Sequence, residues 1–229
     1  MNLIKILSVL ILLFTFTSCS FWFNGRKCTT ADVSYGPADF KVNLTKYSSE
    51  EKAQKSLMIL PQSGGASFID QNYAKQFCAN GYDVYIVNSW SNDKEIKIDF
   101  YGKAQKAISL ILAQVHTPFI GLLGTSSGGL HTGVAANTQT KIDSFFIVAG
   151  GVPTLDPLKL GELFKTKDIG MAITSKEAYK NQLRLKEFLK PKKLITVSYD
   201  TYWGVLNTWL FHSDEILAFF DDSFASRKM

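Results

Sequence analysis

The fold of this chain of 229 residues is decided by the stretch Phe119-Ile120-Gly121-Leu122-Leu123-Gly124-Thr125-Ser126-Ser127-Gly128-Gly129. Its first half is a continuous apolar run, which is typical of a β-strand covered on both faces. Its second half is small and polar, and it leads into a helix expected over residues 127–137. Gly124, Ser126 and Gly128 match the pattern G-x-S-x-G, in which the two glycines allow a sharp turn from strand to helix. The stretch therefore predicts a strand, a tight turn with Ser126 at its apex, and a helix.

Strand and helix patterns alternate on both sides of this stretch. Strands are expected at residues 39–46, 57–60, 82–87, 119–123, 145–148 and 193–197, and helices at residues 68–78, 101–115, 127–137, 176–189 and 214–220. Such alternation requires right-handed crossovers and produces a mostly parallel sheet with helices on both faces. The predicted fold class is α/β. Residues 150–191 are expected to hold two or three helices and no large lid.

The composition suits one globular domain and excludes a collagen, a coiled coil and a polytopic membrane protein. Hydrophobic residues make up 46% of the chain, which is enough for a substantial core, and charged residues make up 20%. The net charge is +5, and no run of Lys and Arg exceeds two residues, so no nucleic-acid partner is expected. Cys and His residues do not cluster at metal-ligand spacing, and we expect neither a metal site nor a cofactor.

The start of the chain has the pattern of an export signal. Lys5 precedes an apolar block at residues 6–16, which is too short for a bilayer because a spanning helix needs about 20 residues. The block ends in Phe16-Thr17-Ser18-Cys19, which resembles the lipobox of bacterial lipoproteins. The resemblance implies a signal peptide at residues 1–18 and a lipid anchor on Cys19, with Ser20 favouring the outer membrane. The alternative is a chance cysteine after an ordinary signal peptide.

The mature chain divides into an N-terminal segment with edge strands, residues 19–54, and a main domain, residues 55–229. Two further cysteines, Cys28 and Cys78, lie in these two parts. An exported compartment permits a disulfide between them. The alternative is a pair of buried or free thiols.

The turn at Ser126 resembles the nucleophile elbow of the α/β-hydrolase superfamily, and the resemblance extends from about Lys55 to the end of the chain. It implies that Ser126 is a nucleophile and that the N–H of Ser127 is one oxyanion donor. The loop Leu60-Pro61-Gln62-Ser63-Gly64-Gly65 corresponds to the family's second oxyanion loop, so Ser63 or its neighbour Gly64 is the expected second donor. An ordinary glycine-rich turn or a phosphate-binding loop remains the alternative, although the Lys of a P-loop is absent.

The resemblance also implies a base and an acid. The family order is nucleophile, acid, histidine, and only His212 follows every candidate acid; it also directly precedes the helix expected at residues 214–220. Asp200, just after the strand at residues 193–197, is the expected acid, and Asp156 is the second choice. Only a short last strand at residues 209–211 would fit between Asp200 and His212. A helix-capping or surface histidine and a surface turn aspartate are the alternatives.

Together, these features imply a membrane-anchored serine hydrolase that cleaves an ester or related acyl bond of a small molecule without a cofactor. The runner-up is an envelope lipoprotein that keeps a degenerate hydrolase scaffold for binding and has no turnover. The sequence carries no indication of the oligomeric state.

Overall fold

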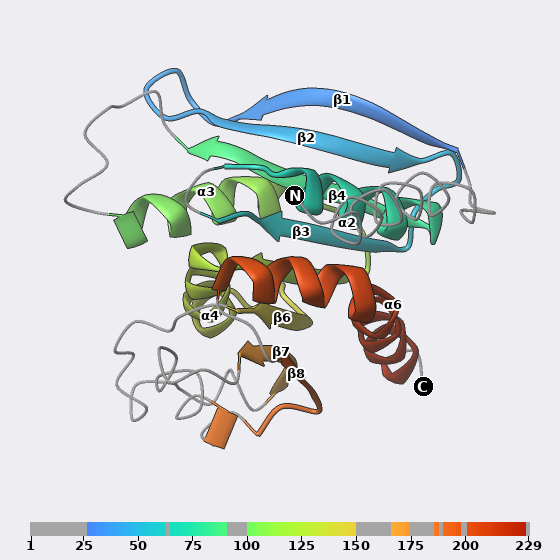
Figure 1. The fold of residues 1–229 in the computed structure, drawn as a ribbon. Helices are drawn as coiled ribbons and strands as arrows, with labels where there is room; N and C mark the ends of the chain where they lie inside the picture. The colour runs from blue at the N-terminus through green and yellow to red at the C-terminus, as the bar shows by residue number, and fades with distance from the viewer. Residues whose placement is uncertain are drawn as a thin grey trace, which may run out of the picture.

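The structure is a computed structural model that describes residues 27–62, 65–90, 100–149, 166–174, 186–187, 190–197 and 201–227. This part of the chain forms an 8-stranded sheet in the order β1-β2-β4-β3-β5-β6-β7-β8 (Figure 1). The strands are β1 (Cys28–Tyr35), β2 (Val42–Ser49), β3 (Lys55–Leu60), β4 (Tyr82–Trp90), β5 (Phe119–Thr125), β6 (Ser144–Val148), β7 (Asp168–Thr174) and β8 (Lys193–Val197). β1 pairs with β2 and β2 with β4 in antiparallel register, and all the other pairs are parallel.

Four helices cover the two faces of this sheet in the described part of the chain. They are α2 (Phe68–Ala79), α3 (Phe100–Gln114), α4 (Ser127–Thr138) and α6 (Thr201–Ser226). Buried side chains of α3 and α4 share one apolar cluster with the sheet, and those of α2 and α6 share the other. The predicted α/β class, a mostly parallel sheet with helices on both faces, is confirmed.

The elements beside the predicted turn follow the expected patterns closely. All seven residues of β5 are buried, as a central strand between two helical layers requires. The apolar residues that recur at helical spacing on α3 are buried, namely Ala104, Ala107, Ile108, Ile111 and Leu112. Within residues 150–191, where two or three helices were expected, the strand β7 was not predicted, and it lies between β6 and β8. Its run Met171-Ala172-Ile173 is buried, and periodicity alone does not separate such a short run from part of a helix.

The end of the chain also differs from the prediction. α6 has 26 residues and begins at Thr201, whereas the sequence pattern predicted a helix only at residues 214–220. Residues 209–211 are helical, so the short last strand considered there does not exist. The first half of α6 is apolar on several sides, with Trp203 and Phe211 exposed and Val205 buried, and this obscures the helical period. The helix expected at residues 176–189 lies mostly outside the described residues.

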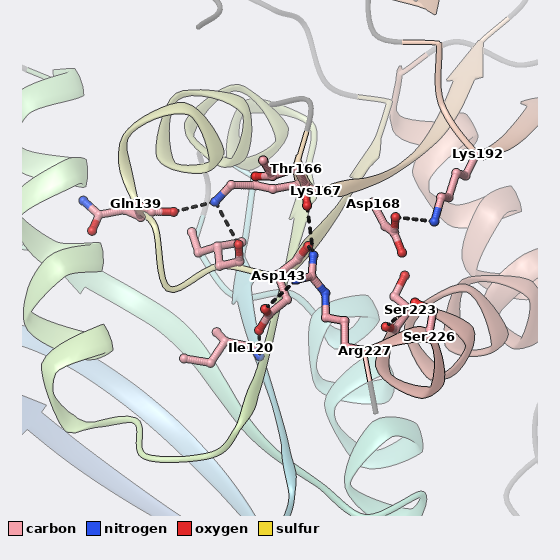
Figure 2. Close-up of polar contacts among 11 residues, drawn as sticks. Ile120, Gln139, Asp143, Thr166, Lys167, Asp168, Lys192, Ser223, Ser226 and Arg227 are labelled. Carbon is pink, nitrogen blue, oxygen red and sulfur yellow. Dashed lines mark hydrogen bonds and ion pairs between the residues drawn. The ribbon is translucent and has the colours of Figure 1, made fainter. Parts of the chain in front are cut away.

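A polar cluster fixes the C-terminal end of α6 to the amino ends of β6 and β7 (Figure 2). Arg227 donates to the carbonyl oxygens of Asp143, at 2.8 Å, and Thr166, at 3.1 Å, and its guanidinium pairs with the Asp143 carboxylate. The buried Lys167 donates to the carbonyl oxygen of Ile142 at 2.8 Å. These contacts set where α6 lies on the sheet, and therefore where its histidine lies.

Cys28 and Cys78 form a disulfide that joins the start of β1 to the end of α2. The bridge decides between the two alternatives that the sequence left open. No helix in the described ranges is long and apolar enough to cross a membrane.

Candidate active site

Ser126 occupies a strained backbone position between β5 and α4. Its φ is 51° and its ψ is −117°, a region that costs a residue with a Cβ about 1–3 kcal/mol. The turn is held by two backbone hydrogen bonds: the Ser126 N–H donates to the Val148 carbonyl at 2.9 Å, and the Gly129 N–H donates to the Ser126 carbonyl at 3.0 Å. The predicted order of strand, tight turn and helix is confirmed, and Ser126 is the residue with the strained backbone.

The two glycines of the motif are required by close packing. A Cβ on Gly124 would lie 2.1 Å from Thr132 Oγ1, and a Cβ on Gly128 would lie 1.8 Å from the Leu60 carbonyl oxygen. Real Cβ atoms do not approach other atoms so closely. The first turn of α4 therefore packs directly against the carboxyl end of β3, which brings the loop after β3 next to Ser126.

The side chain of Ser126 is available for chemistry. It is partly exposed and makes no capping hydrogen bond to α4, although Ser126 is the residue at the N-cap. The N–H of Ser127 lies in the first helical turn, where backbone donors have no partner within the helix. A helix N-terminus favours negative charge on a nearby oxygen. The turn thus combines a hydroxyl with a donor suited to an oxyanion.

The loop after β3 is described at both of its ends. The Gly65 N–H donates to the Gln62 carbonyl at 2.9 Å, and Gly65 has a φ of 86°. Ser63 and Gly64, either of which was expected to supply the second oxyanion donor, lie outside the described residues. The loop ends at Ser67, which caps α2 through a reciprocal pair of hydrogen bonds with Asp70.

Asp70 was not predicted from the sequence, and it lies beside the turn at Ser126. Its side chain is buried, with 1% of its surface exposed. Asp70 Oδ1 accepts a hydrogen bond of 3.3 Å from Thr125 Oγ1, the residue before Ser126. The signal that could have found it is the capping pattern Ser67-Phe68-Ile69-Asp70 in front of a helix.

His212 does not lie in front of a helix but twelve residues into α6, counted from Thr201. Its Nδ1 lies 2.6 Å from Glu215 Oε1, and the other oxygen of Glu215 pairs with Lys193 at the start of β8. β8 is three strands from β5 in the sheet, a lateral separation of roughly 14 Å at the usual strand spacing. Among the described residues His212 is therefore paired with Glu215, on a helix that begins at Thr201, and it makes no hydrogen bond to Ser126.

The structure describes the two remaining histidines, whereas three further predicted residues lie outside the described residues. His131, on α4, is buried with 1% exposed, and burial lowers its pKa to about 4, so it is neutral at pH 7. His116 lies before the amino end of β5, at the opposite end of that strand from Ser126. Cys19, Asp156 and Asp200 lie outside the described residues, although Asp200 directly precedes α6 in the sequence. Within the described ranges no group of three or more His, Cys, Asp or Glu residues could hold a metal ion.

Comparisons with known proteins support the same fold. No family model and no curated protein matches the chain. Among solved structures, an α/β hydrolase from Penicillium superposes with a TM-score of 0.67 at 14% identity, covering 86% of this chain and 99% of that chain. A dienelactone hydrolase from Anabaena variabilis gives 0.65 at 15% identity, covering 82% and 97%. The thioesterase domain from the curacin biosynthetic pathway gives 0.64 at 10% identity, covering 83% and 98%.

These structures share an overall fold with the chain at low sequence identity. The chain has the α/β-hydrolase fold.

Proposed function

We propose that this protein is a serine hydrolase that cleaves an ester or related acyl bond, with Ser126 as the nucleophile. The observation that carries the proposal is the left-handed backbone of Ser126, at φ 51°, with its side chain free of a capping role. Strain of this kind persists where the surrounding structure enforces it, and it concentrates at functional sites. The flanking glycines and the packing of α4 against β3 enforce it here.

In the proposed reaction Ser126 Oγ attacks the acyl carbonyl and forms a tetrahedral intermediate. The N–H of Ser127, and an N–H of Ser63 or Gly64, stabilise the oxyanion, a contribution of a few kcal/mol for each donor. Asp200 takes the Ser126 proton during the attack, and the intermediate then collapses to an acyl-enzyme as the alcohol or thiol leaves with that proton. Water then attacks the acyl-enzyme, which releases the acid and restores Ser126.

In the proposed reaction the Asp200 carboxylate acts as the base, and His212 takes no part. Carboxyl ends of parallel strands meet at one edge of a sheet, and Asp200 follows β8, whose last residue is Val197. His212 is instead engaged with Glu215. A carboxylate is a weaker base than imidazole, so slow turnover and a preference for acyl groups with good leaving groups are expected.

A second candidate function is ligand binding on the same scaffold without turnover. The pairing of His212 with Glu215 favours it, because the histidine implied by the family order is then absent from Ser126. Steady-state hydrolysis of p-nitrophenyl acetate, p-nitrophenyl butyrate and an acyl thioester separates the two functions. The hydrolase proposal expects turnover that Ser126→Ala abolishes. Turnover equal to that of the Ser126→Ala variant would favour the binding function.

The same proposal includes export and membrane attachment. Residues 1–18 would be removed, and diacylation of Cys19 would anchor the protein in the bacterial envelope, with Ser20 directing it to the outer membrane. Each buried methylene of an acyl chain contributes about 0.8 kcal/mol to membrane binding. The Cys19→Ala variant should move from the membrane fraction to the soluble fraction. Unchanged retention in membranes would contradict lipid anchoring.

A further inference from the structure

Asp70 connects two segments that are far apart in sequence and adjacent at the proposed site. Its Oδ2 accepts hydrogen bonds from the Ser67 N–H at 2.8 Å and from Ser67 Oγ at 2.6 Å. Its Oδ1 accepts the bond from Thr125 Oγ1 at 3.3 Å. One carboxylate therefore holds the last residue of the loop after β3 and the residue before the nucleophile.

The connection is buried, so each of its hydrogen bonds replaces contact with water. Asp70 and Thr125 expose 1% and 2% of their surfaces. Burial raises the pKa of Asp70, while the hydrogen bonds from Ser67 and Thr125 act to lower it. Removing a donor from a buried carboxylate leaves that oxygen unsatisfied, which is more costly than the loss of an exposed hydrogen bond.

A capping role for α2 explains only half of this geometry. The bonds between Asp70 and Ser67 satisfy the first turn of α2, as in other capping boxes. The bond from Thr125 adds nothing to that cap. It ties the cap to β5 at the position where the strand turns into Ser126.

We infer that Asp70 is a positioning residue that holds the loop after β3 in register with the turn at Ser126. The inference rests on the proposed function, because the two segments supply the two oxyanion donors. Ser127 follows Ser126, and Ser63 and Gly64 precede Ser67 by a few residues. The hydrogen bonds that Ser67 and Thr125 donate to Asp70 thus set the spacing between the end of the loop after β3 and the turn at Ser126, and an error of about 1 Å in such spacing can cost a factor of 10² in rate.

The test is the rate at which a fluorophosphonate labels Ser126 in the folded protein. Thr125→Val removes the hydroxyl with little change of shape, and we expect labelling to slow by about 10- to 100-fold. The matched control is Thr117→Val at the other end of β5, which removes a hydroxyl bonded to Ser56 Oγ at 2.8 Å. The control should label at the wild-type rate.

Substitutions of Asp70 separate positioning from folding. Asp70→Asn can still accept from Ser67 and donate to Thr125, so it should restore most of the rate that Asp70→Ala loses. In the background of Asp70→Ala, the further change Thr125→Val should have almost no effect, because the bond is already absent. Hydrogen exchange of the amides of residues 65–71 should quicken in Thr125→Val and not in Thr117→Val.

The outcomes distinguish this inference from the proposed function. If the folded wild-type protein is not labelled, the proposed function fails, and this positioning role fails with it. If the wild type is labelled and Thr125→Val is labelled at the same rate, the positioning role alone is wrong. Equal slowing by Thr125→Val and Thr117→Val would also overturn it, because the effect would then follow stability rather than the position of the hydroxyl.

Discussion

His212 and Glu215 lie one turn apart on α6, with His212 Nδ1 at 2.6 Å from Glu215 Oε1. Glu215 also pairs with Lys193 on β8, so the three side chains form a connected network along the edge of the sheet. This network gives His212 a structural partner. Its ring therefore plays no part in activating Ser126 in our account.

The first prediction concerns His212→Gln. The substitution should leave the rate of ester turnover within about twofold of wild type, because the imidazole is paired with Glu215 and has no role in the proposed reaction. Asp200→Asn should lower turnover by at least tenfold, in line with the usual contribution of a proton-transfer group. The two variants are compared at equal folded fraction. A loss of turnover confined to His212→Gln would restore the histidine to the reaction.

His212→Gln should also change the pKa of the Glu215 carboxyl. The hydrogen bond from His212, followed by that from Lys193, lowers the pKa of the Glu215 carboxyl. A carboxyl with a lowered pKa contributes stability that is present above its unfolded pKa, about 4.3, and is lost as the pH falls through its folded pKa. His212→Gln should therefore raise the pKa of Glu215, as measured by NMR titration, and weaken the acid dependence of stability below pH 4.3.

A second prediction tests the packing of the turn at Ser126. Gly128→Ala should destabilise the fold by about 3 kcal/mol and abolish labelling of Ser126, because its Cβ would overlap the Leu60 carbonyl. Gly133→Ala, on the same helix, places its Cβ 4.0 Å from Ile147 and should be neutral or up to about 1 kcal/mol stabilising. Urea unfolding of both variants measures the difference. Equal stability of the two variants would argue against the tight turn.

A third prediction concerns the disulfide between Cys28 and Cys78. The bridge closes a loop with a sequence separation of 50, and the chain-entropy model gives about 4 kcal/mol for a loop of that length. The double variant with both cysteines replaced by serine should lose stability of that order in urea unfolding. Adding a reductant should destabilise the wild type and leave the double variant unchanged. A reductant effect of equal size in both proteins would contradict the bridge.

A fourth prediction follows from the buried Lys167 (Figure 2). Burial lowers its pKa to about 8, against about 10.4 in an unfolded chain. Between these values the unfolded chain binds more protons, so the stability contributed by this group rises as the pH rises from about 8 to 10.4. Lys167→Met should remove that rise. The unfolding free energy is measured against pH for the wild type and for Lys167→Met, and the two slopes are compared. Identical slopes would show that the pKa of Lys167 is not lowered.

The central half of the molecule was predictable from the sequence for a physical reason. Strands buried between two helical layers are continuous apolar runs, and helices on a sheet show an apolar stripe, so β3, β5, β6 and α3 follow from pattern alone. The motif around Ser126 added a backbone requirement that glycine satisfies. These local signals agree with the global fold, which is why the architecture was found.

The remaining features of the fold and of the site could not be predicted, because local sequence patterns do not reveal contacts between distant residues. β1 is largely exposed at the edge of the sheet and has no apolar run. In β7 the continuous apolar run is only Met171-Ala172-Ile173, which is too short to be told from part of a helix. The position of His212 depended on the start of α6, which its apolar first half conceals. The link from Asp70 to Thr125 spans 55 residues, and the disulfide needed a distance that only the fold supplies.

The most direct test of the central claim is covalent labelling of the folded protein by a fluorophosphonate, with the modified peptide identified by mass spectrometry. Our account predicts one label per chain, on Ser126, and none in the Ser126→Ala variant. Folded wild-type protein that takes up no label, or carries it on another residue, would contradict the assignment of Ser126 as a nucleophile.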